Sequence, residues 1–517
     1  MEQITQPHSQ ALSELIVNVE RAAELQKKSV NFKSIDLDRK QLSILELLIS
    51  GALSPLKGFM SQADCRSVTV DMRLQDGTFW PLPITLDIDN KLASSLETGE
   101  KLALRDGEGL MIAVLTAESI WSDDSKAIHH IGGKIEALQL PIHNDFSDLR
   151  STPEERREFF RKNGWRRVVA FQTDKILHKR SMDSIRLTAE TIDANIVIDY
   201  ADGSDRPDES CHYTNIRCLR AALLHYPRGM GRLGIVPVEP PGNSAGRILL
   251  NAIISKNYGC THLLLDDETV SSDTITTVKG YEGELGVGIL TPSRNKKDEQ
   301  ALISESALKK MLEDGMEIPP DFSYKEVIDE MKKAYPPKER QGFTLFFTGF
   351  SGSGKSTIAN IVMTKLLEIG GRKVTLLDGD IARKNLSSEL NFTKEHRDLN
   401  ITRIGFVANE ITKNGGIAIC CPIAPYESIR ELNRELISAN GGYIEIHVNT
   451  PIEECEKRDR KGLYAKARAG IIKGMTGIDD PYEIPKDPEL RLNTLKMSPE
   501  EAANEVILYL EKERYIK

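Results

Sequence analysis

The chain has 517 residues, 40% of them hydrophobic and 28% charged, with a formal net charge of −9. This length suggests about three domains, and the negative charge argues against binding nucleic acid or acidic membranes over the whole surface. The N-terminus lacks the apolar core of a signal peptide, no apolar run approaches the roughly 20 residues that span a bilayer, and the seven scattered cysteines form no CxxC pair. We therefore expect a cytoplasmic protein with reduced thiols and with neither a nucleic acid nor a membrane as partner.

The first 155 residues are predicted to form a β-rich domain with a few helices. Short β-like runs, such as residues 79–88 and 101–119, alternate with turns marked by Gly and Asp. A helix start signal follows at Thr152 and Pro153, with two glutamates directly after it.

Strands and helices alternate from there to about residue 300, which predicts a parallel sheet. The predicted strands are 168–172, 195–200, 231–238 and 261–267, and residues 243–257 are predicted to be a helix. The stretch 168–181, VVAFQTDKILHKRS, runs from a buried strand through a polar turn into a basic helix start. An α/β nucleotide-binding sheet carries its reactive groups at such a turn.

Residues 301–340 are predicted to be a helical, charged subdomain and linker, ending in the Pro-Pro joint at 335–342. A second α/β domain is expected over 341–517. Altogether the sequence predicts an α/β multidomain protein with domains at 1–155, 156–300, 301–340 and 341–517.

The most specific motif is GFSGSGKS at 349–356, which matches G-x-x-x-x-G-K-[ST] between an apolar strand and a helix. Glycines let backbone N–H groups surround phosphate oxygens, and the helix N-terminus adds partial positive charge. Lys355 is positioned to reach the β- and γ-phosphates, and the Ser356 hydroxyl to bind Mg²⁺. This domain is predicted to bind ATP or a similar nucleotide.

Two carboxylates, Asp378 and Asp380, are predicted to end the strand 373–380. Facing a P-loop, they can orient Mg²⁺ or accept a proton from an acceptor hydroxyl, although Asp also suits a helix N-cap. Beyond them, residues 381–405 carry arginines suited to phosphate or sulfate. The basic, glycine-containing stretch 458–479 is typical of a mobile lid over phosphates, and its simpler interpretation is a surface loop.

These stretches, GFSGSGKST, LLDGD, NFTKEHRDLNITRIG, PIAPY and KGLYAKARAGIIKGMTGID, resemble the adenylyl-sulfate (APS) kinase family over essentially all of 341–517. In that family ATP phosphorylates the 3′-hydroxyl of adenylyl sulfate to give PAPS. The resemblance implies a P-loop kinase domain with a parallel sheet, Mg²⁺ held through Ser356, and catalytic roles for Lys355, Asp378 and Asp380. It implies an ATP site of Gly349, Ser351, Gly352, Ser353, Gly354, Lys355, Ser356 and Thr357, and an adenylyl-sulfate site of Arg383, Phe392, Arg397, Asn400, Ile423, Lys473 and Met475.

Three positions depart from the family pattern. Ile381 replaces an Asn, Met475 replaces a Phe of the adenine clamp, and Cys421 replaces a Ser. None removes the phosphate-binding residues, but Ile381 and Met475 leave open a kinase for another nucleotide with a free 3′-hydroxyl.

The upstream chain, in GALSPLKGFM (51–60) and HYTNIRCLRAALLHYPRGMGRLGIVP (212–237), is similar to ATP sulfurylase. That resemblance implies a PUA-like N-terminal domain and a Rossmann-like nucleotidyltransferase domain, fused ahead of the kinase as in bifunctional PAPS synthetases. The family turn Q-T/x-R-N-P-x-H-x-x-H is altered here: Asp174 stands at the sulfate-binding Arg position. At about 4 Å and an effective dielectric near 20, that exchange of attraction for repulsion is worth several kcal/mol.

Two further family loops are altered as well. The acidic run DDETV (266–270) replaces G-R-D-H-A-G, and in PPGNSAGRI (240–248) Arg247 is shifted by one position. The altered sulfurylase site comprises Gln172, Thr173, Asp174, His178, Ser181 and Asp267.

We therefore expect an adenylyl-sulfate kinase whose sulfurylase-like region is catalytically inactive, with ATP and adenylyl sulfate as its ligands. By analogy with related folds we also expect a homo-oligomer, a dimer or larger. The alternatives are a working bifunctional PAPS synthetase, a binding or regulatory module without turnover, and a nucleotidyltransferase-like site for a cationic or metal-bound substrate at the acidic cluster.

Overall fold

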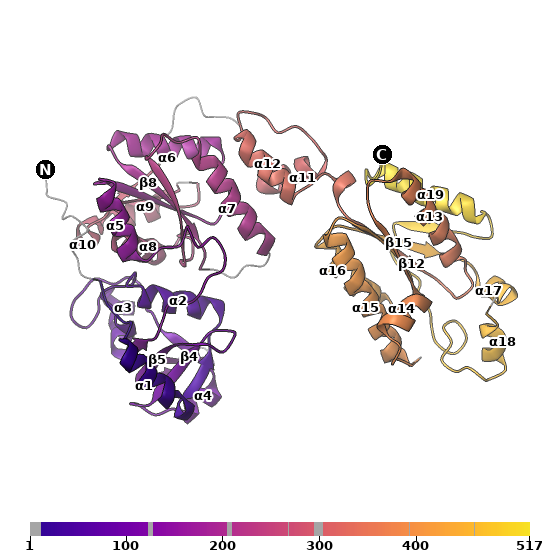
Figure 1. The fold of residues 1–517 in the computed structure, drawn as a ribbon, viewed down its shortest axis with the longest axis horizontal. Coiled ribbons are helices and arrows are strands. Elements are labelled where there is room, and N and C mark those ends of the chain that lie inside the picture. The colour runs from indigo at the N-terminus through magenta and orange to yellow at the C-terminus, as the bar shows by residue number, and fades with distance from the viewer. Residues whose placement is uncertain are drawn as a thin grey trace. The chain divides into compact units, whose positions relative to one another are not determined.

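A computed structural model describes residues 12–122, 128–203, 209–266, 268–293, 303–391, 393–459 and 461–517. The chain divides into two compact units (Figure 1). The first comprises Met1–Leu302 and Ile318–Ala334, and the second Ile303–Glu317 and Tyr335–Lys517. Within the described residues, no helix combines the length and the apolar character needed to cross a membrane.

The first unit begins with the predicted β-rich domain. Its sheet has the order β1-β4-β5-β6-β2, with β3 also paired to β6, and β1 is parallel to β4 while the other pairs are antiparallel. The strands are β1 (Lys33–Asp36), β2 (Gly58–Phe59), β3 (Leu86–Ile88), β4 (Lys101–Arg105), β5 (Met111–Ser122) and β6 (His129–Ala137). The helices are α1 (Val19–Lys28), α2 (Arg39–Ile49), α3 (Gln62–Asp71) and α4 (Asn90–Ser95).

An all-parallel sheet of order β11-β10-β7-β8-β9 follows. Its strands are β7 (Val168–Thr173), β8 (Asn195–Ala201), β9 (Gly231–Val236), β10 (His262–Leu264) and β11 (Gly288–Leu290). Helix α5 (Pro153–Lys162) precedes the sheet, and α6 (Lys179–Thr191), α7 (Glu209–Leu223), α8 (Ala245–Asn257), α9 (Ser272–Lys279) and α10 (Glu282–Leu285) connect its strands. The central strand β7 is buried along its whole length, as expected for a strand covered on both faces.

The second unit holds another all-parallel sheet, of order β13-β14-β12-β15-β16. Its strands are β12 (Phe343–Thr348), β13 (Val374–Asp378), β14 (Ile417–Cys421), β15 (Gly442–Val448) and β16 (Leu490–Leu492). Its helices are α13 (Lys355–Ile369), α14 (Gly379–Leu386), α15 (Lys394–Lys413), α16 (Glu427–Ser438), α17 (Ile452–Arg458), α18 (Leu463–Arg468) and α19 (Pro499–Lys512).

Alternating side chains of β12 pack into two different hydrophobic cores. Phe343, Leu345 and Phe347 pack into the cluster that includes α13 and α19, whereas Phe346 packs with residues of α15 and α16. Figure 1 shows these helix pairs on opposite faces of the sheet. This doubly covered sheet fixes the end of β12, where the P-loop begins.

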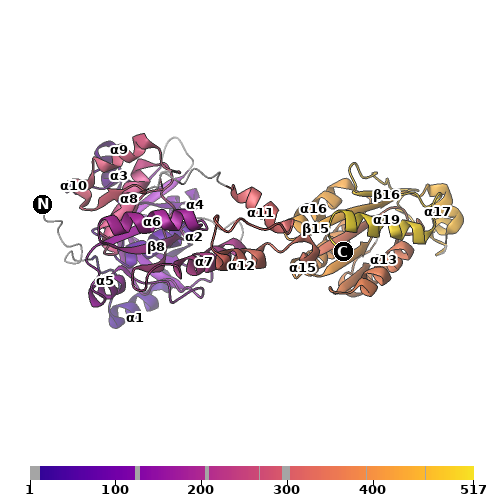
Figure 2. The same ribbon diagram turned by 90° about the horizontal axis from the view of Figure 1, so that it is seen from above.

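The predicted helical segment 301–340 contains α11 (Glu305–Glu313) and α12 (Lys325–Ala334), and these belong to different units. α11 groups with the second unit, whereas α12 packs on α7 in the first, side by side in both views (Figures 1 and 2). Arg217 Nε on α7 donates to Glu330 Oε2 on α12 at 3.0 Å.

Three predicted strand ends were too long. The strands predicted to reach residues 238, 267 and 380 end at Val236, Leu264 and Asp378. In the last case Gly379 opens α14, because an Asp-Gly pair after a strand can as easily begin a helix as extend the strand.

Candidate functional site

The P-loop connects the central strand β12 to α13. Gly349 has φ 145°, and a Cβ there would lie 2.7 Å from the Val448 carbonyl oxygen, so the chain needs glycine at this position. The loop ends at the N-terminus of α13, where helix N–H groups favour anions. Residues 349–354 thus form a compact turn, which leads into α13 and is of the kind that surrounds phosphates.

Lys355 is buried inside this turn. Its Nζ donates to the carbonyl oxygens of Gly349 at 2.8 Å and Phe350 at 2.7 Å. Burial lowers the pKa of this ammonium from its ordinary value to about 8. A bound phosphate would offer a stronger, charged acceptor than these carbonyls.

Ser356 and Asp378 meet across the site. Ser356 Oγ donates to Asp378 Oδ2 at 2.9 Å, which joins the start of α13 to the end of β13. A hydroxyl and a carboxylate are hard oxygen donors of the type that Mg²⁺ prefers. The residues present therefore fit the expected metal.

The structure describes the backbone of Asp380 but not its side chain, and it does not describe Phe392. Asp380 lies in the first turn of α14 rather than at the strand end, and its side chain is outside the described part of the structure. Phe392 lies outside the described residues altogether.

The predicted acceptor residues gather around the start of α15. Asn400 is buried there, and Arg383 Nη1 donates to the Asn391 carbonyl oxygen at 3.0 Å. Arg397 bonds to segment 474–480, where Met475 is half-buried, while Lys473 just before it is exposed. Ile423 lies beside the P-loop, because its carbonyl oxygen accepts from Thr348 Oγ1 at 2.7 Å and from Gly349 N at 3.3 Å.

The altered sulfurylase turn occupies the corresponding place after β7. Several of its polar groups bond to the protein itself, whereas the buried Gln172 Oε1 has no hydrogen-bond partner among the described residues. Gln172 Nε2 donates to Ser255 Oγ at 3.2 Å, and Thr173 Oγ1 accepts from Lys175 N at 3.0 Å. The Asp174 carbonyl oxygen accepts from Asn215 Nδ2 at 2.9 Å.

His178 is covered by residues just before α12. Its Nδ1 lies 3.0 Å from Ser323 Oγ, and its ring lies against Phe322 with centroids 4.3 Å apart. The next residue, Lys179, donates its backbone N–H to the Phe322 carbonyl oxygen at 3.3 Å. Burial lowers the His178 pKa to about 4, so the ring is neutral near pH 7 and offers no charge to a phosphate.

Two arginines near the altered loops are paired with acids. Arg180 lies 4.0 Å from Glu268 of the acidic loop, and Arg247 forms an ion pair with Glu239. Ser181 is exposed on α6, and Asp267 lies outside the described residues. These ion pairs reduce the positive charge available to an anion.

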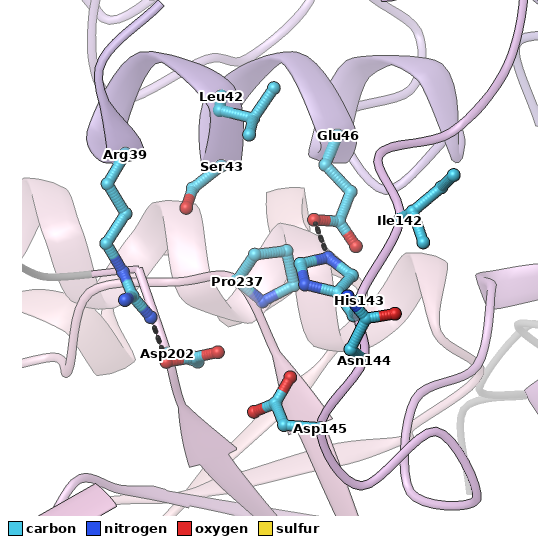
Figure 3. Close-up of a pocket in the computed structure, with 10 residues that line it drawn as sticks. All are labelled: Arg39, Leu42, Ser43, Glu46, Ile142, His143, Asn144, Asp145, Asp202 and Pro237. Atoms are coloured by element: carbon cyan, nitrogen blue, oxygen red, sulfur yellow. Dashed lines mark hydrogen bonds and ion pairs between the residues drawn. The ribbon is translucent and has the colours of Figure 1, made fainter. Parts of the chain in front are cut away.

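Sequence reasoning missed a cavity of about 240 Å³ between α2 and the ends of β8 and β9 (Figure 3). Arg39 on α2 pairs with Asp202 at 2.7 Å, and Glu46 on the same helix lies 2.8 Å from His143 Nε2. The spacing of 39, 42, 43 and 46 on one helix face was a usable signal, but its partners come from distant loops.

Asp145, Asp202 and His212 lie close enough beside this cavity to ligate a metal. Arg150 Nη2, however, lies 3.0 Å from Asp145 Oδ2 and 2.8 Å from Asp202 Oδ2, so a guanidinium already supplies the cation. This cluster is an ion-pair network that joins parts of the first unit.

Comparison with protein families matches three segments. Residues 341–493 match the adenylylsulphate kinase model, residues 147–271 the ATP-sulfurylase model, and residues 5–136 a PUA-like domain. The predicted fold class is confirmed: a PUA-like domain, a sulfurylase-type α/β domain and a kinase domain with a parallel sheet.

Similar proteins extend over the whole chain. Sulfate adenylyltransferases of Phaeosphaeria nodorum and Aspergillus terreus are 36% and 38% identical, covering 98% of this chain and 98% and 99% of their own lengths. A solved structure, "Hexameric APS kinase from Thiobacillus denitrificans", is 37% identical, with a TM-score of 0.85 and 100% coverage of both chains. The chain belongs to the bifunctional family in which a PUA-like domain and an ATP-sulfurylase domain precede an adenylylsulphate kinase domain.

Proposed function

We propose that this protein is an adenylyl-sulfate kinase that transfers the γ-phosphoryl group of ATP to the 3′-hydroxyl of adenylyl sulfate. The observation that carries the proposal is the convergence of buried Lys355 with the Ser356–Asp378 pair at the end of a doubly covered sheet. The family kinase domain and the similarity to the APS kinase structure from Thiobacillus denitrificans support it.

The reaction needs positioning and charge neutralisation more than covalent chemistry by the protein. Lys355 exchanges its carbonyl partners for phosphate oxygens, and the P-loop N–H groups hold the β- and γ-phosphates. Ser356 and Asp378 would hold Mg²⁺, which neutralises charge on the phosphates when bound. The acceptor oxygen forms its bond to the γ-phosphorus as the bond to the β-phosphate oxygen breaks, and its proton passes to a carboxylate, a role we assign to Asp380.

We further propose that the sulfurylase-like region forms no adenylyl sulfate. Asp174 would repel sulfate, the covered His178 is neutral, and Arg180 and Arg247 face acids. Each feature opposes the binding of ATP and sulfate, which carry several negative charges together.

A second candidate is a bifunctional PAPS synthetase. The observation favouring it is the name sulfate adenylyltransferase on relatives that are 36% and 38% identical over almost their full length. It predicts release of pyrophosphate from ATP that depends on sulfate.

The kinase proposal is tested by incubating the full-length protein with ATP, Mg²⁺ and adenylyl sulfate and measuring ADP and PAPS. A panel of nucleotides with free 3′-hydroxyls, at matched concentration, tests the acceptor. Absence of PAPS would contradict the proposal. Faster turnover of another nucleotide would show that this nucleotide, and not adenylyl sulfate, is the preferred acceptor.

We also propose that the protein forms a homo-oligomer. Leu399 and Phe406, seven residues apart on α15, are 40% and 58% exposed, and Ile381 on α14 is 56% exposed. Such apolar side chains suit a contact with a second copy. Light scattering of the wild type and of Phe406→Glu tests this, and a monomeric wild type would contradict it.

A further inference from the structure

Arg397, in the first turn of α15, is the attachment point of the segment 474–480. Its Nη1 donates to the Gly474 carbonyl oxygen at 2.9 Å and to Thr476 Oγ1 at 3.2 Å, while its Nη2 forms an ion pair with Asp480 Oδ2. The Arg397 side chain is 13% exposed and that of Asp480 is 29% exposed. Partial burial makes this pair stronger than an ordinary surface ion pair.

The guanidinium is only partly satisfied on the edge that faces Asp480. Its Nε is buried and has no hydrogen-bond partner among the described residues, while Nη2 on the same edge is held by one carboxylate oxygen. An anion with two oxygens would bond to Nε and Nη2 together, which is the geometry in which arginine binds oxyanions best. Asp480 therefore occupies half of a bidentate anion site.

The segment is fixed at its far end. Two residues beyond Asp480, the Tyr482 hydroxyl lies 3.0 Å from Thr348 Oγ1, and Glu483 N donates to the Pro425 carbonyl oxygen at 2.8 Å. Gly474, at the near end, has φ 72°, a conformation that glycine adopts without strain. Loss of the Asp480 contact would loosen the end of the stretch near residue 480, while Nη1 still holds Gly474 and Thr476 and residues 482 and 483 stay attached.

We propose that Asp480 is a latch that competes with the acceptor's anionic group for Arg397 and so sets the affinity for the acceptor. Entry of the acceptor exchanges the Asp480 carboxylate for ligand oxygens at Nε and Nη2, while Nη1 keeps its bonds to the segment. This inference rests on the proposed function, since it takes the acceptor anion to bind Arg397. Asp480 is a positioning residue, because it acts through Arg397.

The kinetic test is Asp480→Asn, which removes the charge and preserves the shape. We expect the KM for adenylyl sulfate to fall about threefold to tenfold while the KM for ATP stays unchanged. Asp479→Asn is the matched control. Asp479 is exposed, and its carboxylate accepts a hydrogen bond from Gly474 N at 3.1 Å rather than one from Arg397. This control should leave both KM values unchanged.

A second readout needs no substrate. Without nucleotide, amide hydrogen exchange over residues 475–480, which leaves out the Gly474 amide bonded to Asp479, should be faster in Asp480→Asn and Asp480→Ala than in the wild type and Asp479→Asn. An unchanged or increased KM for adenylyl sulfate in Asp480→Asn, or unchanged exchange in both Asp480 variants, would overturn the latch. If the wild type forms no PAPS although these Asp480 variants accelerate exchange, the proposed function fails and the latch contact itself stands.

Discussion

Two turns in this molecule begin alike and differ in chemistry. Each follows the central strand of a five-stranded parallel sheet, β7 or β12, and each leads into a helix whose first residue is lysine, Lys179 or Lys355. After β12 the glycine-rich turn wraps a buried ammonium. After β7 the turn carries Asp174, and His178 lies under Phe322 and Ser323.

On the function proposed above, both turns keep the sheet and its strand–turn–helix connection, and only the turn after β12 binds phosphate. The scaffold places a helix N-terminus at the end of a strand in both cases. At α6, one N–H group is bonded to the Phe322 carbonyl oxygen, so the helix end is capped by the protein itself. The two turns therefore differ in their side chains and in the bonding of this helix N–H group, and not in the fold that carries them.

The largest expected effect comes from replacing, one at a time, the lysine that begins each helix. Lys355→Met should lower the rate of PAPS formation by at least about a thousandfold, because the γ-phosphoryl group loses the ammonium of the P-loop. Lys179→Met should change it by less than about twofold. Steady-state assays of PAPS formation measure both rates. A large loss of rate in the Lys179 variant would contradict the assignment of phosphate transfer to the P-loop turn alone.

The second effect concerns the Ser356–Asp378 pair. Asp378→Asn should lower kcat about tenfold to a hundredfold and raise the Mg²⁺ concentration for half-maximal rate, since an amide binds the metal more weakly than a carboxylate. Asp174→Asn, the same change in the other turn, is the control and should leave the rate unaltered. Mg²⁺ titrations of both variants measure this, and an unchanged Mg²⁺ requirement in Asp378→Asn would contradict the assignment.

Nucleotide binding should take up a proton at alkaline pH. The pKa of Lys355 is about 8 without ligand, so at pH 8.5 much of the side chain is neutral, and phosphate binding raises that pKa. Calorimetry in two buffers of different ionisation enthalpy should give an uptake of up to about one proton per nucleotide. Lys355→Arg, which stays charged, should show none, and equal uptake in both proteins would exclude Lys355 as its source.

The smallest expected effect lies at the turn after β7, where Phe322 and Ser323 cover His178. Phe322→Ala should raise the pKa of His178 from about 4 toward its ordinary 6.5, because water then reaches the ring. Since the folded-state pKa is lowered, stability is lost as pH falls from about 6.5 to 4, and this loss should be smaller in the variant. NMR titration measures the His178 pKa, and unfolding at pH 4.5 and 7.5 measures the loss of stability, with an unchanged kinase rate as the control. An unchanged His178 pKa would show that Phe322 does not shield the ring from water.

The fold followed from the sequence because apolar strand patterns and helix start signals are local. Thr152, for example, caps α5 in a capping box with Glu155, as the Thr-Pro-Glu-Glu signal predicted. The P-loop geometry was likewise encoded in consecutive residues. The covering of His178 by residues 322–323 was not predictable, because it joins positions 145 residues apart.

The central claim is that phosphate chemistry belongs to the P-loop and not to the sulfurylase-like turn. The most direct measurement follows two products of the full-length protein in parallel: pyrophosphate from ATP and sulfate, and PAPS from ATP and adenylyl sulfate. We predict PAPS formation that Lys355→Met abolishes, with no pyrophosphate release that depends on sulfate. Such release, retained in Lys355→Met and lost in a variant of the 172–178 turn, would contradict the account and establish a bifunctional enzyme.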